Sequence, residues 1–283
     1  MAARTEPQLF DRFAVVDWSG ANVPRSGADS IWIAASGTAS ANPVTRAQAT
    51  ERIADLIEDA LGANERLMIG FDFAFGFPAG FASAVGLDGW QSIWAHLHDR
   101  IEDGADNRSN RFDVAAHWNR LLPGDGPFWG YTMKAGLPDG LSRKSHSVWS
   151  HPFGYKREAE QRERKASPVF KLAYTGSVGS QSLLGIARLE ELRRRFAGRV
   201  AVWPFETAFA DDLSAPVVFT EIYPTRHGVP DGPEVKDQRQ VEAVLRDFEA
   251  WNGERLRGVL AVPSLCGGAR MAVQREEGWV VGL

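Results

Sequence analysis

The chain has 283 residues, of which 44% are apolar and 24% charged, and this composition excludes wholesale disorder. Its formal net charge of −4 at pH 7 excludes a bulk attraction to nucleic acid, so any such contact must be local. The single cysteine, Cys266, excludes an intrachain disulfide and a multi-cysteine zinc site.

Neither an export signal nor a membrane span is evident in the sequence. The first twelve residues contain no long apolar core, and no stretch of about 18 apolar residues occurs anywhere. We therefore expect a cytoplasmic protein that makes no contact with a membrane. Its oligomeric state stays open.

The first part of the chain is predicted to contain two strands, a helix and a central strand. The apolar segments 13–18 and 30–36 are separated by a loop rich in Gly, Asn, Pro and Ser, which predicts two antiparallel strands. Between residues 45 and 61 apolar side chains recur at helical spacing, and Gly62 ends this helix. The nearly continuous apolar segment 66–73 predicts a parallel strand that is covered on both faces.

Residues 77–178 interrupt this regular order. They combine short helical pieces with loops rich in Gly, Pro, Trp and His, and we expect an insertion that shapes the active-site cleft. The alternating charges of 155–165 predict an exposed helix held by side-chain pairs, with a phosphate-contacting face as the alternative. The core is accordingly predicted to comprise residues 1–76 and 179–283.

Regular structure returns after the insertion. An apolar stripe predicts a helix at 180–196, and the apolar segments 199–205 and 216–224 predict two strands. A last long helix is expected at 234–252, and the tail 276–283 predicts a terminal strand or an ordered docking segment. This order predicts an α/β fold with a mixed sheet flanked by helices. A doubly wound domain fits less well because the chain opens with a hairpin.

Acidic residues lie at the ends of two predicted strands. Asp17 ends the first strand and Asp72 ends the central one, so neighbouring strands would bring the two carboxylates together. Clustered carboxylates repel each other unless a cation or a proton lies between them. Mg²⁺ suits such a cluster because it prefers hard oxygen ligands. The alternative for each aspartate is to cap backbone N–H groups at a strand end.

Three further acids could complete such a site. Glu206 and Glu221 each follow an apolar strand, and Glu221 is the preferred candidate. Asp237 lies at the centre of the apolar stripe of the last helix, so its carboxylate should face inward. A buried charge is costly unless a metal or an arginine compensates it. Alternatively, Asp237 only interacts with the helix dipole in the first turn.

Several motifs together resemble a known family. AVVDWSG, GFDFAFGFP, KLAYTGSVGSQSLLGI, VWPFET, TEIYP and KDQRQVEAVL are similar to segments of the uncharacterised proteins described as predicted RNase H-like nucleases, and the resemblance spans nearly the whole chain. It implies an RNase H-like core and a carboxylate site for metal. A second acid is usual beside Asp237 in this pattern and is absent here. The number of metal ions that the site binds, one or two, is therefore left open. The residues that the resemblance assigns to catalysis and to the metal are Asp17, Asp72, Glu221 and Asp237.

We therefore expect a nuclease or phosphodiesterase that depends on Mg²⁺ or Mn²⁺ and acts on nucleic acid or a nucleotide-like phosphoester. Two alternatives are an ATP-dependent phosphotransferase on the related actin-like core and a non-catalytic binding protein. Some similar proteins carry an automated label for molybdopterin-guanine dinucleotide synthesis. We discount that label because the chain lacks a GxxxxGK[ST] loop and a Gly-rich nucleotidyltransferase opening.

A second candidate site precedes the helix expected at 180–196. The segment TGSVGSQ at 175–181 could hold a phosphate on its backbone N–H groups, and an ordinary helix N-cap is the alternative. The six histidines are scattered, and no GxSxG motif marks an activated serine. The candidate cofactor-binding residues are Ser177, Gly179 and Ser180. The basic residues of the insertion that could meet phosphate oxygens are Arg108, Arg111, Lys134, Arg143, Lys144, Lys156 and Arg157.

Overall fold

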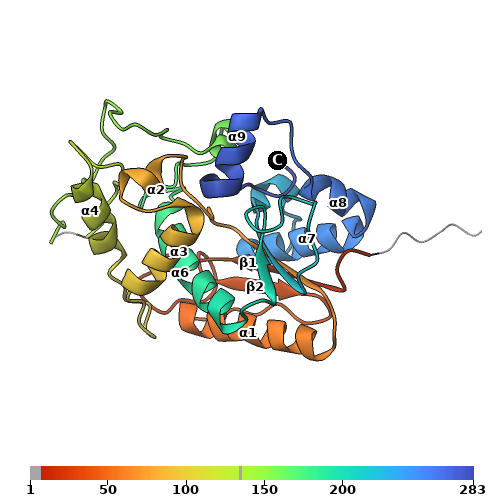
Figure 1. Cartoon of the computed structure of the whole chain (residues 1–283). Helices are drawn as coiled ribbons and strands as arrows, with labels where there is room; N and C mark the ends of the chain where they lie inside the picture. The colour runs from red at the N-terminus through yellow and green to blue at the C-terminus, as the bar shows by residue number, and fades with distance from the viewer. Residues whose placement is uncertain (1–7, 134–135) are drawn as a thin grey trace, which may run out of the picture. The chain divides into compact units, whose positions relative to one another are not determined.

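A computed structural model describes residues 8–133 and 136–283 of the chain (Figure 1). These residues form two compact units. The first unit contains the described residues up to Asp72 together with 196–264 and 280–282. The second unit contains the described residues of 73–195 together with 265–279 and Leu283.

The first unit contains a five-stranded mixed sheet in the order β2-β1-β3-β5-β4. One pair, β1 (Arg12–Asp17) with β2 (Trp32–Ala35), is antiparallel. The other pairs are parallel and join β1 to β3 (Leu67–Phe71), β3 to β5 (Val217–Glu221) and β5 to β4 (Val200–Val202). The predicted α/β class, the opening hairpin and the central parallel strand are confirmed.

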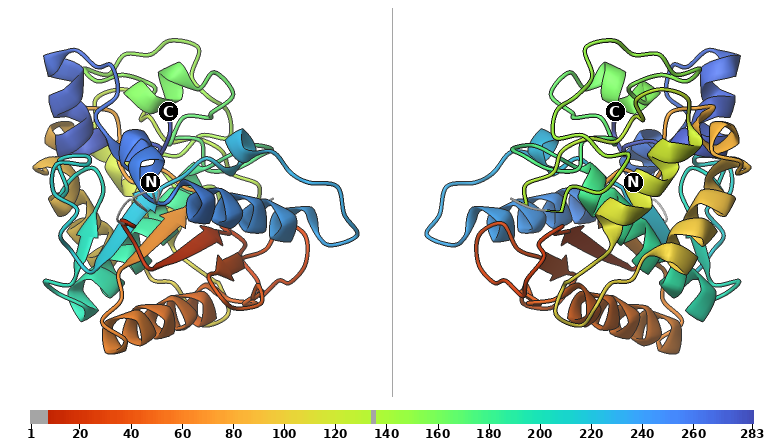
Figure 2. Two further views of the ribbon diagram at one scale, coloured as in Figure 1. Left: turned by 90° about the vertical axis from the view of Figure 1, so that its right-hand side faces the viewer. Right: turned by 90° about the vertical axis from the view of Figure 1, so that its left-hand side faces the viewer.

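Helices cover both faces of this sheet. Figure 2 shows α1 (Arg46–Gly62) on one face and α7 (Lys236–Trp251) on the other. The side chain of Thr45 caps α1 by accepting a hydrogen bond from the N–H of Gln48 at 3.2 Å, which satisfies one of the free donors of the first turn. The first unit also contains a 3₁₀ turn (Pro224–His227) and α8 (Glu254–Leu260).

Gly70 in the central strand allows α7 to approach the sheet closely. A Cβ atom at this position would lie 2.8 Å from Cγ2 of Ile222 and 3.3 Å from Cε2 of Phe248, a side chain of α7. The space over Gly70 is therefore filled by these two side chains. Beside this contact with Gly70, α7, which carries Asp237 in its first turn, packs against β1 and β2.

The second unit consists of short helices around an aromatic core. Rings of Phe77, Phe81, Trp118 and Phe128 pack with centroids 4.9 to 6.0 Å apart. The helices of this unit are α2 (Phe81–Ala84), α3 (Gly89–Arg100), α4 (Arg111–Leu121), α5 (Glu158–Arg162), α6 (Gly179–Arg195), α9 (Gly267–Ala272) and a π-helical turn (Val273–Glu277).

The structure tests two further expectations. The helix predicted at 155–165 is reduced to α5, and it is not simply a solvated helix, because Arg157 and Glu160 are buried and form an ion pair of 2.9 Å. The tail forms no strand of the sheet and follows the second alternative, an ordered docking segment, because Val280 makes an isolated parallel bridge with Glu221 and the N–H of Val281 donates to the carbonyl of Glu221 at 2.9 Å. No helix within the described residues is long and apolar enough to cross a membrane.

Candidate carboxylate site

Asp17 and Asp72 meet at the carboxyl ends of two neighbouring parallel strands. The register pairs Val16 of β1 with Phe71 of β3, so Asp17 and Asp72 are the next pair along the two chains. The N–H of Asp72 continues the ladder by donating to the carbonyl of Val16 at 3.2 Å. The two side chains therefore point to the same face of the sheet and hydrogen-bond to each other.

This hydrogen bond requires a proton between the two carboxyl groups. Burial and the neighbouring Asp72 carboxylate raise the pKa of Asp17 well above its usual value. Burial also raises the pKa of Asp72 to about 6, although hydrogen bonds from Asp17 and from the N–H of Trp18, at 2.7 Å, oppose this rise. Both residues are only partly buried, so the pair remains open to solvent.

Asp237 and Asp29 add two more carboxylates to the surroundings of this pair. The charge of Asp237, in the first turn of α7, contributes to the raised pKa of both Asp17 and Asp72, and the charge of Asp29 contributes to that of Asp17. Oδ2 of Asp237 accepts a hydrogen bond from the N–H of Asp29 at 2.7 Å. Asp29 has a left-handed backbone (φ 53) and forms an ion pair with Arg25 at 3.1 Å.

Asp29 is a neighbour of the pair that was not predicted from the sequence. Asp29 lies in the loop between β1 and β2, which has no periodicity to indicate where its side chain points. An aspartate in a turn is among the commonest features of loops, because its side chain tolerates the left-handed conformation. Only its contact with Asp237, 208 positions further along the chain, places it beside the pair.

Glu221 and Glu206 lie elsewhere. Glu221 pairs in register with Phe71, one residue before Asp72, and successive side chains of a strand point to opposite faces. The buried Glu221 side chain is therefore directed to the face of the sheet opposite to that of Asp17 and Asp72. Glu206 closes a turn after β4, where its Oε2 accepts the N–H of Val202 at 2.9 Å. The structure thus brings together Asp17, Asp72 and Asp237 without either glutamate.

The arrangement has direct consequences for metal binding. Among residues 8–133 and 136–283, no group of three or more His, Cys, Asp or Glu side chains is spaced so that it could hold a metal ion. The raised pKa values of Asp17 and Asp72 favour their protonated forms, whereas a cation would bind their carboxylate forms. Metal binding at Asp17 and Asp72 would therefore compete with protons.

The predicted phosphate-binding segment forms part of the second unit, where its polar groups contact the protein itself. The N–H of Gly179 donates to the carbonyl of Lys171 at 2.9 Å, and the N–H of Ser177 closes a turn in the same loop. The Ser180 hydroxyl donates to a backbone carbonyl at 2.6 Å and accepts a hydrogen bond from Nε of Arg111 at 2.8 Å. These contacts are those of an ordered helix start.

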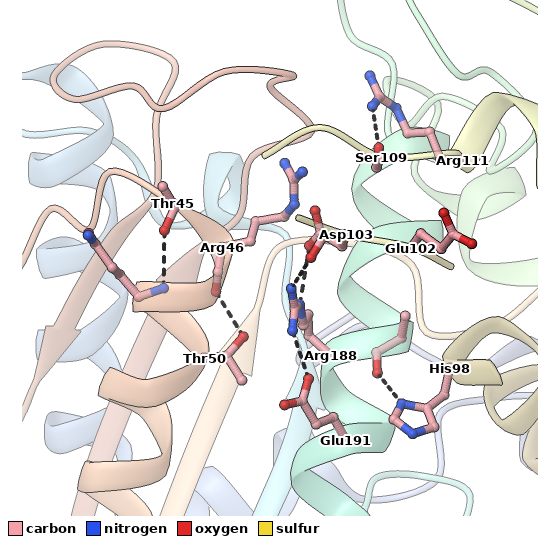
Figure 3. A network of polar contacts seen from close by, with 12 residues as sticks. Thr45, Arg46, Thr50, His98, Glu102, Asp103, Ser109, Arg111, Arg188 and Glu191 are labelled. Atoms are coloured by element: carbon pink, nitrogen blue, oxygen red, sulfur yellow. Dashed lines mark hydrogen bonds and ion pairs between the residues drawn. The ribbon is translucent and has the colours of Figure 1, made fainter. Parts of the chain in front are cut away.

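Several basic residues of the predicted insertion also have structural partners. Arg111, besides its bond to Ser180, donates to the hydroxyl of Ser109 at 2.8 Å (Figure 3). Arg157 is 2% exposed and is held by Glu160. Lys156 donates to the carbonyl of Ala166 at 2.8 Å. Lys134 lies outside the described residues.

A comparison with protein-family models, curated proteins and solved structures found no match to this chain. Functional conclusions therefore depend on the geometry and chemistry of the chain's own residues.

Proposed function

We propose that this protein is a divalent-metal-dependent phosphodiesterase or nuclease whose site contains Asp17 and Asp72. The main support is the hydrogen-bonded pair that these residues form at the carboxyl ends of β1 and β3, within the electrostatic influence of Asp237. Acids crowded in this way are unfavourable at neutral pH unless a proton or a cation compensates them. A site that is partly open to solvent and rich in hard oxygen ligands suits Mg²⁺ or Mn²⁺.

An RNase H-like core is part of this proposal. The sheet opens with the antiparallel pair β1–β2 and continues with the parallel strand β3 on the other side of β1. Acids follow the first and the central strand, and a third acid lies on the late helix α7. These features agree with what the sequence resemblance implies, and they support the assignment without requiring Glu221 as a ligand.

Each acid has a distinct role in the proposed site. Asp17 and Asp72 are the metal ligands, and Asp237 either completes the ligand set or orients bound water. A bound metal would activate water and stabilise the leaving oxygen of a phosphodiester. Because ligation requires the carboxylate form, metal binding must release the proton that the pair now shares. Glu221 is left out of the set because it faces the opposite side of the sheet.

Cleavage assays test this function directly. The wild-type protein and its Asp17→Asn and Asp72→Asn variants are incubated with Mg²⁺ or Mn²⁺ and labelled single-stranded, duplex, branched and hybrid DNA and RNA, with bis(4-nitrophenyl) phosphate as a small phosphoester. Asp55→Asn, at an exposed position of α1, is the matched control. We expect metal-dependent cleavage by the wild-type and control proteins, and a loss of at least about 100-fold in both site variants.

Two outcomes would contradict the proposal. One is equal cleavage by wild type and Asp17→Asn. The other is no cleavage of any substrate by folded wild-type protein with either metal. If ATP stabilises the protein against unfolding and no substrate is cleaved, the ATP-dependent phosphotransferase is favoured.

A further inference from the structure

Three residues with complementary chemistry line one cavity of the second unit. Ser142, His146 and Asp125 all face a cavity of about 550 Å³. Oγ of Ser142 lies 3.3 Å from Nε2 of His146, and Nδ1 of His146 lies 3.2 Å from Oδ2 of Asp125. A hydroxyl, an imidazole and a carboxylate are thus connected in series through the two nitrogens of one ring.

The order of these contacts determines which nitrogen of His146 carries the proton in the neutral ring. A carboxylate accepts hydrogen bonds and cannot donate one, so Nδ1 beside Asp125 keeps its proton. Nε2 then presents its lone pair toward the Ser142 hydroxyl. This is the tautomer that a general base needs in order to remove a proton from a serine hydroxyl.

A buried side chain holds the two segments that carry these residues. Nδ2 of Asn119, in α4, donates to the carbonyls of Phe128 and Gly140 at 2.9 Å and 2.8 Å, and its Oδ1 accepts the N–H of Phe128 at 3.0 Å. The loop with Asp125 and the segment before Ser142 are therefore fixed to the same amide. Support of this kind maintains the geometry of a catalytic group.

A purely structural role would explain part of these contacts. The Ser142 hydroxyl also donates a hydrogen bond to the carbonyl of Lys144 at 2.7 Å, which closes a turn. The hydroxyl proton thus has two acceptors, one of them the ring nitrogen. The Asp125 side chain is 78% exposed and that of His146 25%, so solvent weakens the effect of the carboxylate on the ring. Any reaction in which His146 acts as the general base for Ser142 is therefore expected to be slow.

We infer that Ser142 is the nucleophile of a second, metal-independent site that hydrolyses small carboxylic esters, with His146 as general base and Asp125 as a positioning residue. Leu122 and Leu141 give the cavity an apolar wall that fits a short acyl chain. This inference is independent of the carboxylate site, because all its residues belong to the second unit.

The proposed reaction proceeds in two steps. Oγ of Ser142 attacks the ester carbonyl while its proton passes to Nε2 of His146, and the ester C–O bond breaks as the leaving oxygen takes that proton. Water then attacks the acyl-serine, giving its proton to His146, which returns it to Oγ of Ser142. The products are a carboxylic acid and an alcohol, with no change of oxidation state.

The test combines covalent labelling with ester hydrolysis. The full chain is treated with a fluorophosphonate probe in EDTA, the labelled serine is located by mass spectrometry, and hydrolysis of 4-nitrophenyl acetate is measured in the same buffer. We expect the label on Ser142. Ser142→Ala should abolish labelling and hydrolysis, whereas Ser145→Ala, an exposed serine of the same loop, should retain both.

Two further variants separate catalysis from folding. His146→Gln leaves Ser142 in place and should lower kcat by about 100-fold. Asp125→Asn should lower kcat by about 10-fold at unchanged KM, with partial recovery in Asp125→Glu, because an exposed carboxylate orients the ring less strongly than a buried one. A label on another serine, hydrolysis that survives in Ser142→Ala, or equal rates in wild type and His146→Gln would overturn the inference.

Discussion

Asp17 and Asp72 directly follow the register pair Val16–Phe71 of the parallel strands β1 and β3, and their side chains interact closely enough to shift each other's pKa. The contact is favourable only while one proton is shared between the two groups. When that proton leaves, two negative charges face each other in a partly buried site, with Asp237 nearby. The pair is thus a local source of instability at high pH that a cation, or the loss of one charge, would relieve.

The first prediction concerns the pH dependence of stability. The pKa of Asp72 rises from 3.8 to about 6 in the folded protein, and that of Asp17 also rises, so the folded state binds protons more tightly than the unfolded state. The free energy of unfolding should therefore decrease as the pH rises from about 4 through about 6. We expect Asp17→Asn, which keeps a hydrogen-bond donor, to be more stable than wild type by about 1–3 kcal/mol at pH 8 and little changed at pH 4.

Urea unfolding at both pH values measures this difference. Asp55→Asn, on the exposed side of α1, serves as the control for the loss of one negative charge. The proposed proton sharing would be contradicted by an Asp17→Asn variant that is destabilised equally at pH 4 and pH 8.

The second prediction concerns metal binding. Millimolar Mg²⁺ or Mn²⁺ should raise the Tm of the wild-type protein at pH 8, because a ligand that binds only the folded state stabilises it. The shift should shrink at pH 5, where protons compete for Asp17 and Asp72, and should be lost in Asp72→Asn. Thermal unfolding followed by circular dichroism measures both effects. An equal shift in wild type and Asp72→Asn would place the metal elsewhere.

The third prediction concerns the contact between the sheet and α7. Gly70→Ala places a Cβ atom 2.8 Å from Cγ2 of Ile222 and 3.3 Å from the ring of Phe248, so the packing must shift. We expect a loss of about 1–3 kcal/mol in the free energy of unfolding. Gly62→Ala is the control, because a Cβ there meets no atom within 4 Å. Equal stability of the two variants would mean that α7 does not pack on Gly70 as described.

The fourth prediction concerns the buried ion pair of the second unit. Arg157 and Glu160 are 2% and 3% exposed and lie 2.9 Å apart, so removing the Glu160 carboxylate leaves the Arg157 guanidinium buried without this ion pair. We expect Glu160→Ala to cost about 3–5 kcal/mol. Glu158→Ala, which removes the more exposed pair with Arg162, should cost less than about 1 kcal/mol. Chemical denaturation of both variants distinguishes a structural pair from a solvated one.

The two long helices of the first unit were predicted well from the sequence because the apolar pattern of a helix is local. The helix expected at 45–61 is α1 (Arg46–Gly62), and the one expected at 234–252 is α7 (Lys236–Trp251). Each has an apolar stripe long enough to distinguish a helix from a strand. The short helices α8 (Glu254–Leu260) and α9 (Gly267–Ala272) were missed because one or two turns offer too few repeats for a period to be recognised.

The local sequence pattern was not sufficient to predict every residue of the site. Asp17 ends β1 and Asp72 directly follows β3, and their position in the sequence was enough to predict that they meet. Glu221 also ends a strand, but the register aligns it with Phe71 and not with Asp72. Since strand side chains alternate between faces, a difference of one residue directs it to the opposite face of the sheet. Register depends on pairing between distant segments, which the sequence of one strand does not contain.

The amino-acid sequence by itself determined the α/β class, the strand ends that carry acids, and the expectation that Asp17 and Asp72 lie close together. The tertiary structure alone decided that Asp29 joins Asp237, and that Ser142, His146 and Asp125 face one cavity. Hydrophobic periodicity is a property of neighbouring residues and is visible in the chain. Contacts between loops depend on how the whole chain folds, because loop residues have no repeating pattern that fixes their direction.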